Sequence, residues 1–153
     1  MLYGKVWKMK LNITIEPQSL NGYVNISPLL GKSLFQLDVE NNSCTDIIAE
    51  VIDYIPHTLL QQVVDHYLSK LRHKARIILG GTSLLELSRL VMIGQINQAD
   101  ANKIIFGTNN HAWDMKRSLS DLHIVAKYLQ EKGLKLIKQR LDGVKWCVEA
   151  IRE

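Results

Sequence analysis

Hydrophobic and polar residues alternate with a period of two near the start of the chain, and this pattern predicts a β-strand within Leu2–Thr14. A polar loop follows, and the apolar run Tyr23–Ile26 reads as a second, short strand. Ser33–Val39 is interpreted as a third short strand, Asp46–Val51 as a buried fourth strand and Ala75–Leu79 as a fifth. The first half of the chain is therefore predicted to be rich in strands joined by short connections.

Helical periodicity begins after the fourth predicted strand. Pro56–Leu71 carries one continuous apolar stripe, as expected of a helix packed on a sheet. Leu84–Ile96 is apolar nearly all round, which predicts a buried helix, and a Ser or Thr before it with Glu86 three residues on matches a helix-capping pattern. Asn97–Phe106 and Ser118–Lys132 are predicted to be two further helices.

The chain closes with two apolar runs, Leu134–Leu141 and Val144–Ile151, on either side of Asp142-Gly143. An Asp-Gly pair between two extended runs is a strong signal for a β-hairpin. Strand–helix alternation before it indicates parallel pairing with right-handed crossovers. The sequence thus predicts an α/β, three-layer sheet of about seven mostly parallel strands, with a C-terminal antiparallel hairpin, in a single domain spanning residues 1–153.

Composition limits the class of protein but names no activity. The chain has 153 residues, with 46% hydrophobic and 22% charged, which is ordinary for a globular domain. The two cysteines, Cys44 and Cys147, are far apart and suit neither zinc nor a disulfide framework, so we expect reduced thiols, no metal and a cytoplasmic protein. No apolar run reaches the length of a membrane span, and the net charge of +4 does not by itself indicate a nucleic-acid partner.

Four segments, in this order and at this spacing, resemble a known family. They are Leu11-Asn12-Ile13, Gly22–Asn25, Ile48–His57 and Asp142–Arg152. Together they resemble the class I S-adenosylmethionine-dependent methyltransferases, and most of all a short bacterial and phage branch of that class. The resemblance implies a Rossmann-like methyltransferase sheet, with S-adenosylmethionine as the cofactor if the pocket is functional.

The two cofactor anchors of that family are missing here. Where the family has a glycine-rich loop after the first strand, this chain has Thr14, Ile15 and Glu16. Side chains at these places block the close backbone approach that glycine permits. Where the family ends its second strand with an acid that holds the ribose hydroxyls, this chain has Ser27. A serine offers one uncharged hydroxyl in place of two charged oxygens.

Three residues are the candidates that the resemblance leaves for cofactor binding. Asp38 and Val39 fall at the end of the third predicted strand, where the family places an aspartate near the adenine. Glu50 falls near the end of the fourth, facing the position of methyl transfer. The alternative interpretation is that Asp38 and Glu50 are ordinary polar residues at strand ends. The polar stretch Asn109–Asp114 is a hypothetical lid, or else a surface loop, and no catalytic residue is assigned.

Three functions remain open. The first is a degenerate methyltransferase-like domain, without cofactor, that serves as a binding or structural module for an unknown protein partner. The second is an active methyltransferase with a divergent pocket and an unknown acceptor, since methyl transfer depends mainly on alignment. The third is a small nucleotide- or nucleic-acid-binding protein using the basic run Lys70–Arg76, which otherwise is a solvated connection. The apolar helix Leu84–Ile96 also predicts a homodimer.

Overall fold

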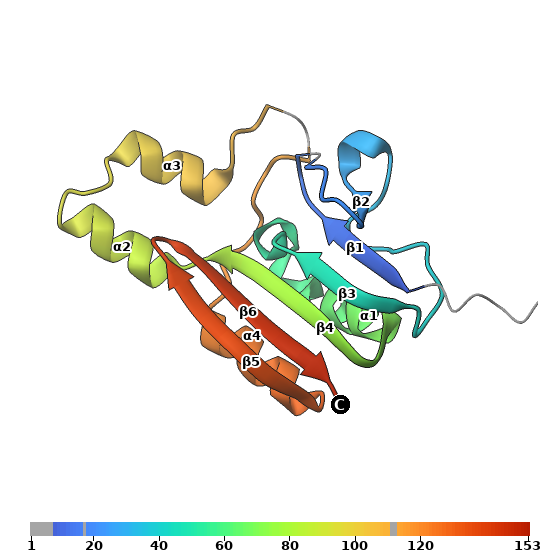
Figure 1. Ribbon diagram of the computed structural model, residues 1–153. Coiled ribbons are helices and arrows are strands. Elements are labelled where there is room, and N and C mark those ends of the chain that lie inside the picture. The colour runs from blue at the N-terminus through green and yellow to red at the C-terminus, as the bar shows by residue number, and fades with distance from the viewer. Residues whose placement is uncertain (1–7, 17, 111–112) are drawn as a thin grey trace, which may run out of the picture.

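The computed structural model describes residues 8–16, 18–110 and 113–153, and within them the strands form one six-stranded sheet (Figure 1). The spatial order of the strands is β2-β1-β3-β4-β6-β5. Their bounds are β1 Met9–Ile13, β2 Val24–Ile26, β3 Cys44–Ala49, β4 Leu71–Thr82, β5 Leu134–Asp142 and β6 Lys145–Arg152. The predicted α/β class is confirmed.

The pairing directions follow the sequence pattern. β1 pairs in parallel with both β2 and β3, and β4 pairs in parallel with β3. β6 is antiparallel to β4 and to β5, so the C-terminal hairpin is confirmed and β5 forms the outer edge. Gly143 supplies the positive φ of 60° that the tight turn between β5 and β6 needs. β2 lies on one side of β1, and β3, the next strand along the chain, lies on its other side, so the β1/β3 junction is the switch point of the sheet.

In the described parts of the chain, four α-helices accompany the sheet: α1 Leu60–Lys70, α2 Leu84–Met92, α3 Gln98–Phe106 and α4 Leu122–Glu131. Three of them begin at a polar cap, since Ser83, Asn97 and Asp121 accept hydrogen bonds from backbone N–H groups of the first turn. Within the described ranges, no helix is both long enough and apolar enough to cross a membrane.

The helices α1 and α4 lie on the same face of the sheet (Figure 1). The strand residues that face them are fully buried, including Leu11, Ile47, Ile77 and Val148. The alternate residues of β3, β4 and β6 are only half-buried. In the described part of the chain, the helical cover predicted for both faces is therefore found on one face.

A row of charges crosses this half-buried face from strand to strand. Asp46 on β3 pairs with Lys10 on β1 at 3.9 Å and with Arg76 on β4 at 2.6 Å. Arg76 also reaches Glu149 on β6 at 3.2 Å. These two carboxylates raise the pKa of Arg76, with the Asp46 hydrogen bond as the largest cause. The four side chains satisfy one another across neighbouring strands, which suits a face that water can reach.

The predicted third strand, Ser33–Val39, is wrong, because this segment is irregular. Leu34 and Leu37 are both buried, but they are held by α1 and not by a neighbouring strand. The Tyr67 hydroxyl donates a 2.5 Å hydrogen bond to the Leu34 carbonyl, and the Leu37 N–H donates to Nε2 of His66 at 2.8 Å. The sheet therefore has six strands in the described residues where about seven were predicted.

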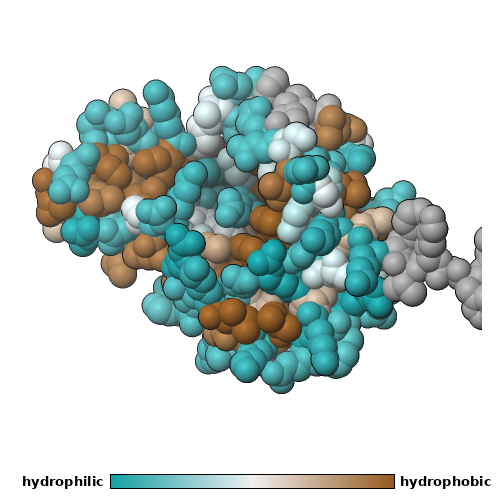
Figure 2. All heavy atoms as spheres, in the orientation of Figure 1, coloured by the Kyte–Doolittle hydropathy of each residue, from teal (hydrophilic) through white to brown (hydrophobic). Residues whose placement is uncertain are grey.

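The helix predicted to be buried within Leu84–Ile96 is mostly exposed. α2 and α3 extend past the end of the sheet, away from α1 and α4 (Figure 1). Leu87 is the only buried residue of α2, and Ala101 is the only one of α3. Figure 2 shows hydrophobic residues gathered on this projecting part of the molecule.

Candidate functional site

The carboxyl ends of the parallel strands meet at one edge of the sheet, where ligands bind in open α/β folds. At this edge β1 continues into Thr14, Ile15 and Glu16, and β2 continues into Ser27. β3 continues into Glu50, and β4 ends at Thr82. The residues that the resemblance associates with a cofactor, apart from Asp38 and Val39, therefore lie along this edge.

The ends of β1 and β2 are closed by their own side chains. Ile15 is buried, with 7% of its surface exposed, and Ser27 is fully buried. The Ser27 hydroxyl donates a 2.8 Å hydrogen bond to the Ile15 carbonyl, and the Thr14 N–H donates to the Ile26 carbonyl at 2.9 Å. The serine that replaces the family's acid is thus committed to the fold.

The backbone after β1 also differs from a glycine-dependent loop. None of Thr14, Ile15 and Glu16 has a positive φ. The connection to β2 is held by side-chain amides, since Asn12 Nδ2 donates to the Gln18 carbonyl at 3.1 Å and to Asn25 Oδ1 at 3.0 Å. No helix occurs between β1 and β2 in residues 14–16 and 18–23, so no helix N-terminus points at this site. One polar atom here, Thr14 Oγ1, is buried without a hydrogen-bond partner among the described residues.

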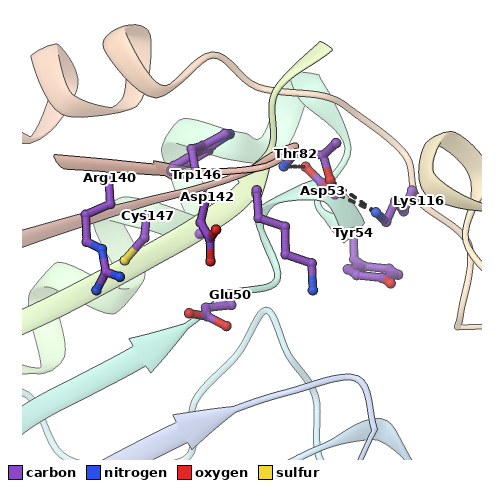
Figure 3. Close-up of a pocket in the computed structure, with 12 residues that line it drawn as sticks. Glu50, Asp53, Tyr54, Thr82, Lys116, Arg140, Asp142, Trp146 and Cys147 are labelled. Carbon is purple, nitrogen blue, oxygen red and sulfur yellow. Dashed lines mark hydrogen bonds and ion pairs between the residues drawn. The ribbon is translucent and has the colours of Figure 1, made fainter. Parts of the chain in front are cut away.

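A pocket of about 390 Å³ lies further along the same edge, at the ends of β3 and β4 and beside the β5–β6 hairpin (Figure 3). Its polar lining comes from four parts of the chain: Glu50, Asp53 and Tyr54 after β3, Thr82 at the end of β4, Lys116 before α4, and Arg140, Asp142, Lys145 and Cys147 on the hairpin. Of the candidates from the sequence, only Glu50 lines this pocket.

A buried ion pair anchors one side of the pocket. Asp53 Oδ1 accepts from the Thr82 N–H at 3.0 Å, and Asp53 Oδ2 accepts from the Thr82 hydroxyl at 2.5 Å. Lys116 Nζ lies 3.4 Å from Asp53 Oδ2 and donates to Thr82 Oγ1 at 3.2 Å. Figure 3 shows these three side chains converging from η2 (Ile52–Tyr54), β4 and the segment after α3. The charges of Asp53 and Lys116 are therefore largely used within the protein.

The other charges around the pocket are available to a ligand. Glu50, Arg140, Asp142 and Lys145 are exposed, and within the described residues none of them forms an ion pair. Two acids and two bases around one hollow suit a ligand that carries both charges or several polar groups.

Two titratable groups of the pocket stay neutral over the physiological range. Burial raises the pKa of Tyr54 to about 12, and the carboxylates of Asp114 and Asp53 contribute to this rise. Burial also raises the pKa of the Cys147 thiol, and Glu50 adds to this effect. Both groups are therefore hydrogen-bonding or apolar contacts and neither is a ready nucleophile or base at neutral pH.

Gly80 and Gly81 lie within a strand and do not form a turn, because β4 runs through both of them to Thr82. A Cβ atom at Gly81 would lie 2.8 Å from Cζ2 of Trp146 and 2.9 Å from Oδ1 of Asp53. The indole of Trp146 is buried, and its Nε1 donates to the Ser120 carbonyl at 2.8 Å. The glycines thus allow an aromatic ring and a carboxylate to approach the backbone closely and form the floor of the pocket.

Asp38 and Val39 lie elsewhere, in a separate cavity of about 760 Å³ that also includes Met9 and His66. The structure brings these two together but does not bring them to Glu50, which lines the other pocket. Because the Ser33–Val39 segment is irregular, Asp38 is exposed in a loop and not at a strand end.

The proposed lid Asn109–Asp114 includes His111, which lies outside the described residues. Asp114 is buried and accepts from Tyr54 at 3.5 Å and from the Thr108 hydroxyl, and Trp113 packs against the core. These contacts fix the described end of the segment beside the pocket. Asp53, Tyr54 and Lys116 were missed from the sequence, although polar residues in the short segment that follows a buried strand, such as Asp53 and Tyr54 after β3, are a usable signal.

Comparison with known proteins finds similarity in structure but no match in sequence. No protein-family model matches the chain, and neither does any curated protein. Solved structures do match it. A methyltransferase of Aquifex aeolicus that depends on S-adenosylmethionine aligns with a TM-score of 0.54 and 8% identity, covering 96% of this chain and 85% of that one.

Two further solved structures are similar to this chain over most of its length. The 1,6-didemethyltoxoflavin-N1-methyltransferase of Burkholderia thailandensis, with 1,6-didemethyltoxoflavin and S-adenosylhomocysteine bound, aligns with a TM-score of 0.55 and 9% identity over 95% of this chain and 71% of that one. A possible exported protein of Bordetella parapertussis aligns with a TM-score of 0.58 and 12% identity. It covers 94% of this chain, which spans about half (53%) of the Bordetella protein.

The chain has a class I methyltransferase-like fold. At sequence identities this low, the structural similarity shows the fold alone, and the chemistry of the site depends on the residues present. In the described residues, no three His, Cys, Asp or Glu side chains gather as a metal site would require.

Proposed function

We propose that this methyltransferase-like domain does not bind S-adenosylmethionine and serves as a binding or structural module. One observation carries the proposal: the ends of β1 and β2 are closed by the buried Ile15 side chain and by the hydrogen bond from Ser27 to the Ile15 carbonyl. The family resemblance implies that the cofactor would need a glycine loop and an acid at these two places.

The residues present do not fit the cofactor. A carboxylate that holds two ribose hydroxyls makes charge-assisted hydrogen bonds worth about 1.5–3 kcal/mol each. Ser27 has no charge, and its hydroxyl already donates to the Ile15 carbonyl. Asp38, the family-like partner for the adenine, lines a different cavity from Glu50. Since about 1.4 kcal/mol is a tenfold change in affinity, these losses together remove most of the binding.

The pocket beside Glu50 is where such a module would hold a small polar ligand. It is lined by four exposed charges of both signs, and the ion pair of Asp53 with Lys116 fixes its wall. The same pocket supports the second candidate function, an active methyltransferase with a divergent cofactor site, because methyl transfer needs alignment more than it needs a particular acid or base.

Nucleotide or nucleic-acid binding through Lys70–Arg76 is less well supported. Arg76 is paired with Asp46 and Glu149. Lys70 is buried and donates to Asn41 Oδ1 at 2.8 Å. Two of the cations in this run are therefore committed to the fold. A steep fall of oligonucleotide affinity with salt would restore this candidate.

Calorimetric titration with S-adenosylmethionine and with S-adenosylhomocysteine tests the proposal, together with thermal unfolding at millimolar ligand. We expect no heat and no shift in melting temperature. A ligand present at one hundred times its dissociation constant would stabilise the fold by about 2.7 kcal/mol, which is easily detected. Binding by the wild-type protein would overturn the proposal, and loss of that binding in Glu50→Gln but not in Asp38→Asn would identify the pocket used.

A further inference from the structure

The two most exposed large hydrophobic side chains of the described residues lie on one helix. They are Leu85 and Met92 of α2, with 83% and 86% of their surfaces exposed. They are seven residues apart, which is two helical turns and about 10 Å, so they lie on the same side of the helix. Ser88, a small residue, lies between them on that side.

An apolar groove lies at the start of this helix. Its volume is about 540 Å³, and its apolar lining, from Leu84, Leu85, Leu119, Leu122 and Leu141, is bordered by polar residues that include Glu86, Ser88, Asp121 and His123. The groove is therefore bounded by the first half of α2, the start of α4 and the end of β5. Met92 and Ile93, at the other end of α2, do not line it, and 54% of the Ile93 surface is exposed.

We propose that α2 is the interface of a homodimer, in which two α2 helices pack antiparallel about a twofold axis near Ser88. Met92 and Ile93 of each subunit then enter the groove beside Leu84 and Leu85 of the other. A twofold contact requires a surface that is complementary to itself. The groove and the projecting apolar residues lie at opposite ends of one helix, so a single rotation fills both grooves.

The charges on α2 agree with this arrangement. Within the helix, the charged residues are Glu86 and Arg89, which pair with each other. In an antiparallel pair centred near Ser88, each Glu86 lies closer along the axis to the partner's Arg89 than to the partner's Glu86. The two Arg89 side chains come within about 3 Å of each other along the axis, but each then has its own Glu86 and the partner's Glu86 beside it, which offsets their repulsion. The small Ser88 at the centre allows the two helices to approach closely.

Other edges of the molecule suit a second copy less well. Among the described residues, β5 is one of the two edges of the sheet, but it carries Lys135, Lys138 and Arg140. Antiparallel pairing of two β5 strands would bring these cations together. The groove beside α2 instead draws five leucines from α2, from the segment at the start of α4 and from β5, so it offers apolar contacts to a second copy.

Sedimentation equilibrium at tens of micromolar tests the proposal. We expect the wild-type protein to have twice the monomer mass of 17.5 kDa. Leu85→Lys and Met92→Glu should each give a monomer, while their equimolar mixture should give a heterodimer, because the introduced lysine of one chain then faces the introduced glutamate of the other. Leu30→Glu is the control, since Leu30 is 51% exposed and lies on η1 (Pro28–Leu30), well away from α2.

Circular dichroism of each variant checks that it is folded, which is expected because the substituted side chains are exposed. A monomeric wild type overturns the proposal. A dimer that survives both single substitutions, or a mixture of the two variants that stays monomeric, also overturns it. Loss of the dimer in Leu30→Glu would overturn it as well, because the interface would then lie elsewhere.

Discussion

The hydroxyl of Ser27 donates a 2.8 Å hydrogen bond to the carbonyl oxygen of Ile15, and this bond joins the end of β2 to the loop after β1. Both residues are buried. The two positions at which the family resemblance implies cofactor contacts are thus bonded to each other, and the sheet edge is closed at this point.

Replacing Ser27 by alanine should therefore destabilise the domain. The Ile15 carbonyl would be left buried without this donor, at a cost of about 1–3 kcal/mol. Urea unfolding measures the change, and Ser19→Ala, at an exposed serine, is the control. Ser27→Asp should cost more, because it buries a carboxylate beside a carbonyl oxygen, and it should not create affinity for S-adenosylhomocysteine. Equal stability of Ser27→Ala and Ser19→Ala would contradict this account.

Adding one methyl group at Gly81 should also be costly. A Cβ atom there would meet Trp146 and Asp53 at 2.8 and 2.9 Å, and overpacking of this kind costs about 1–3 kcal/mol. Gly80→Ala is the matched comparison. Its Cβ atom would lie 2.9 Å from the side chain of Glu50, and that side chain is exposed and can move away. The Trp146 carbonyl oxygen, at 3.2 Å, is a milder contact. Thermal unfolding should therefore rank Gly81→Ala as the less stable variant; the reverse order would be inconsistent with the packing described.

The ion pair between Asp53 and Lys116 should respond unequally to removal of its two members. Asp53→Asn leaves the mostly buried Lys116 ammonium without its carboxylate, and breaking a buried pair costs about 3–5 kcal/mol, with the lower end expected for a pair at a pocket wall. Lys116→Met leaves Asp53 with two hydrogen bonds from Thr82, so its cost should be smaller. A double-mutant cycle in urea measures the coupling. A coupling near zero would show that the pair is screened by solvent.

Acid should destabilise the domain through His66. Burial, and secondarily the nearby Lys70 ammonium, lower the pKa of His66 below its usual 6.5. The unfolded chain then binds the proton more readily than the folded one, so stability is present above pH 6.5 and is lost as the pH falls below it. The neutral Nε2 accepts from the Leu37 N–H, an acceptor that protonation removes. His66→Gln keeps a hydrogen-bond acceptor but does not titrate, so this variant should lose less stability than the wild type between about pH 7 and 5. Identical profiles of stability against pH for the two proteins would exclude His66 as the cause.

The parts of the fold that depend on local chemistry were predictable. The Asp142-Gly143 hairpin, the cap at Ser83 and the amphipathic stripe of α1 are each encoded within a few residues, and each is found. The error at Ser33–Val39 has the opposite origin. Leu34 and Leu37 are held by Tyr67 and His66, about thirty residues away, and no short pattern reports such contacts.

The site also combines features that the local sequence encodes with features that depend on distant contacts. That the family's anchors are replaced by Ile15 and Ser27 is visible in the sequence, but their mutual hydrogen bond is not. Asp53 and Lys116 are more than sixty positions apart and meet only because η2 and the segment after α3 come together beside the end of β4. The exposure of α2 was likewise not predictable, since an apolar helix reads as buried whether the protein or a second copy covers it.

The position of β5 has a consequence for the behaviour of the protein in concentrated solution. Within the described residues, no strand pairs with the outer side of β5, so its backbone N–H and C=O groups can bond to an extended segment of another chain. Addition of strands at such an edge is how sheets grow into fibres. Lys135, Lys138 and Arg140 make that addition unfavourable for another copy of the same strand. We therefore expect these cations to oppose aggregation, and their replacement by neutral β-forming residues should lead to fibril formation in concentrated solution.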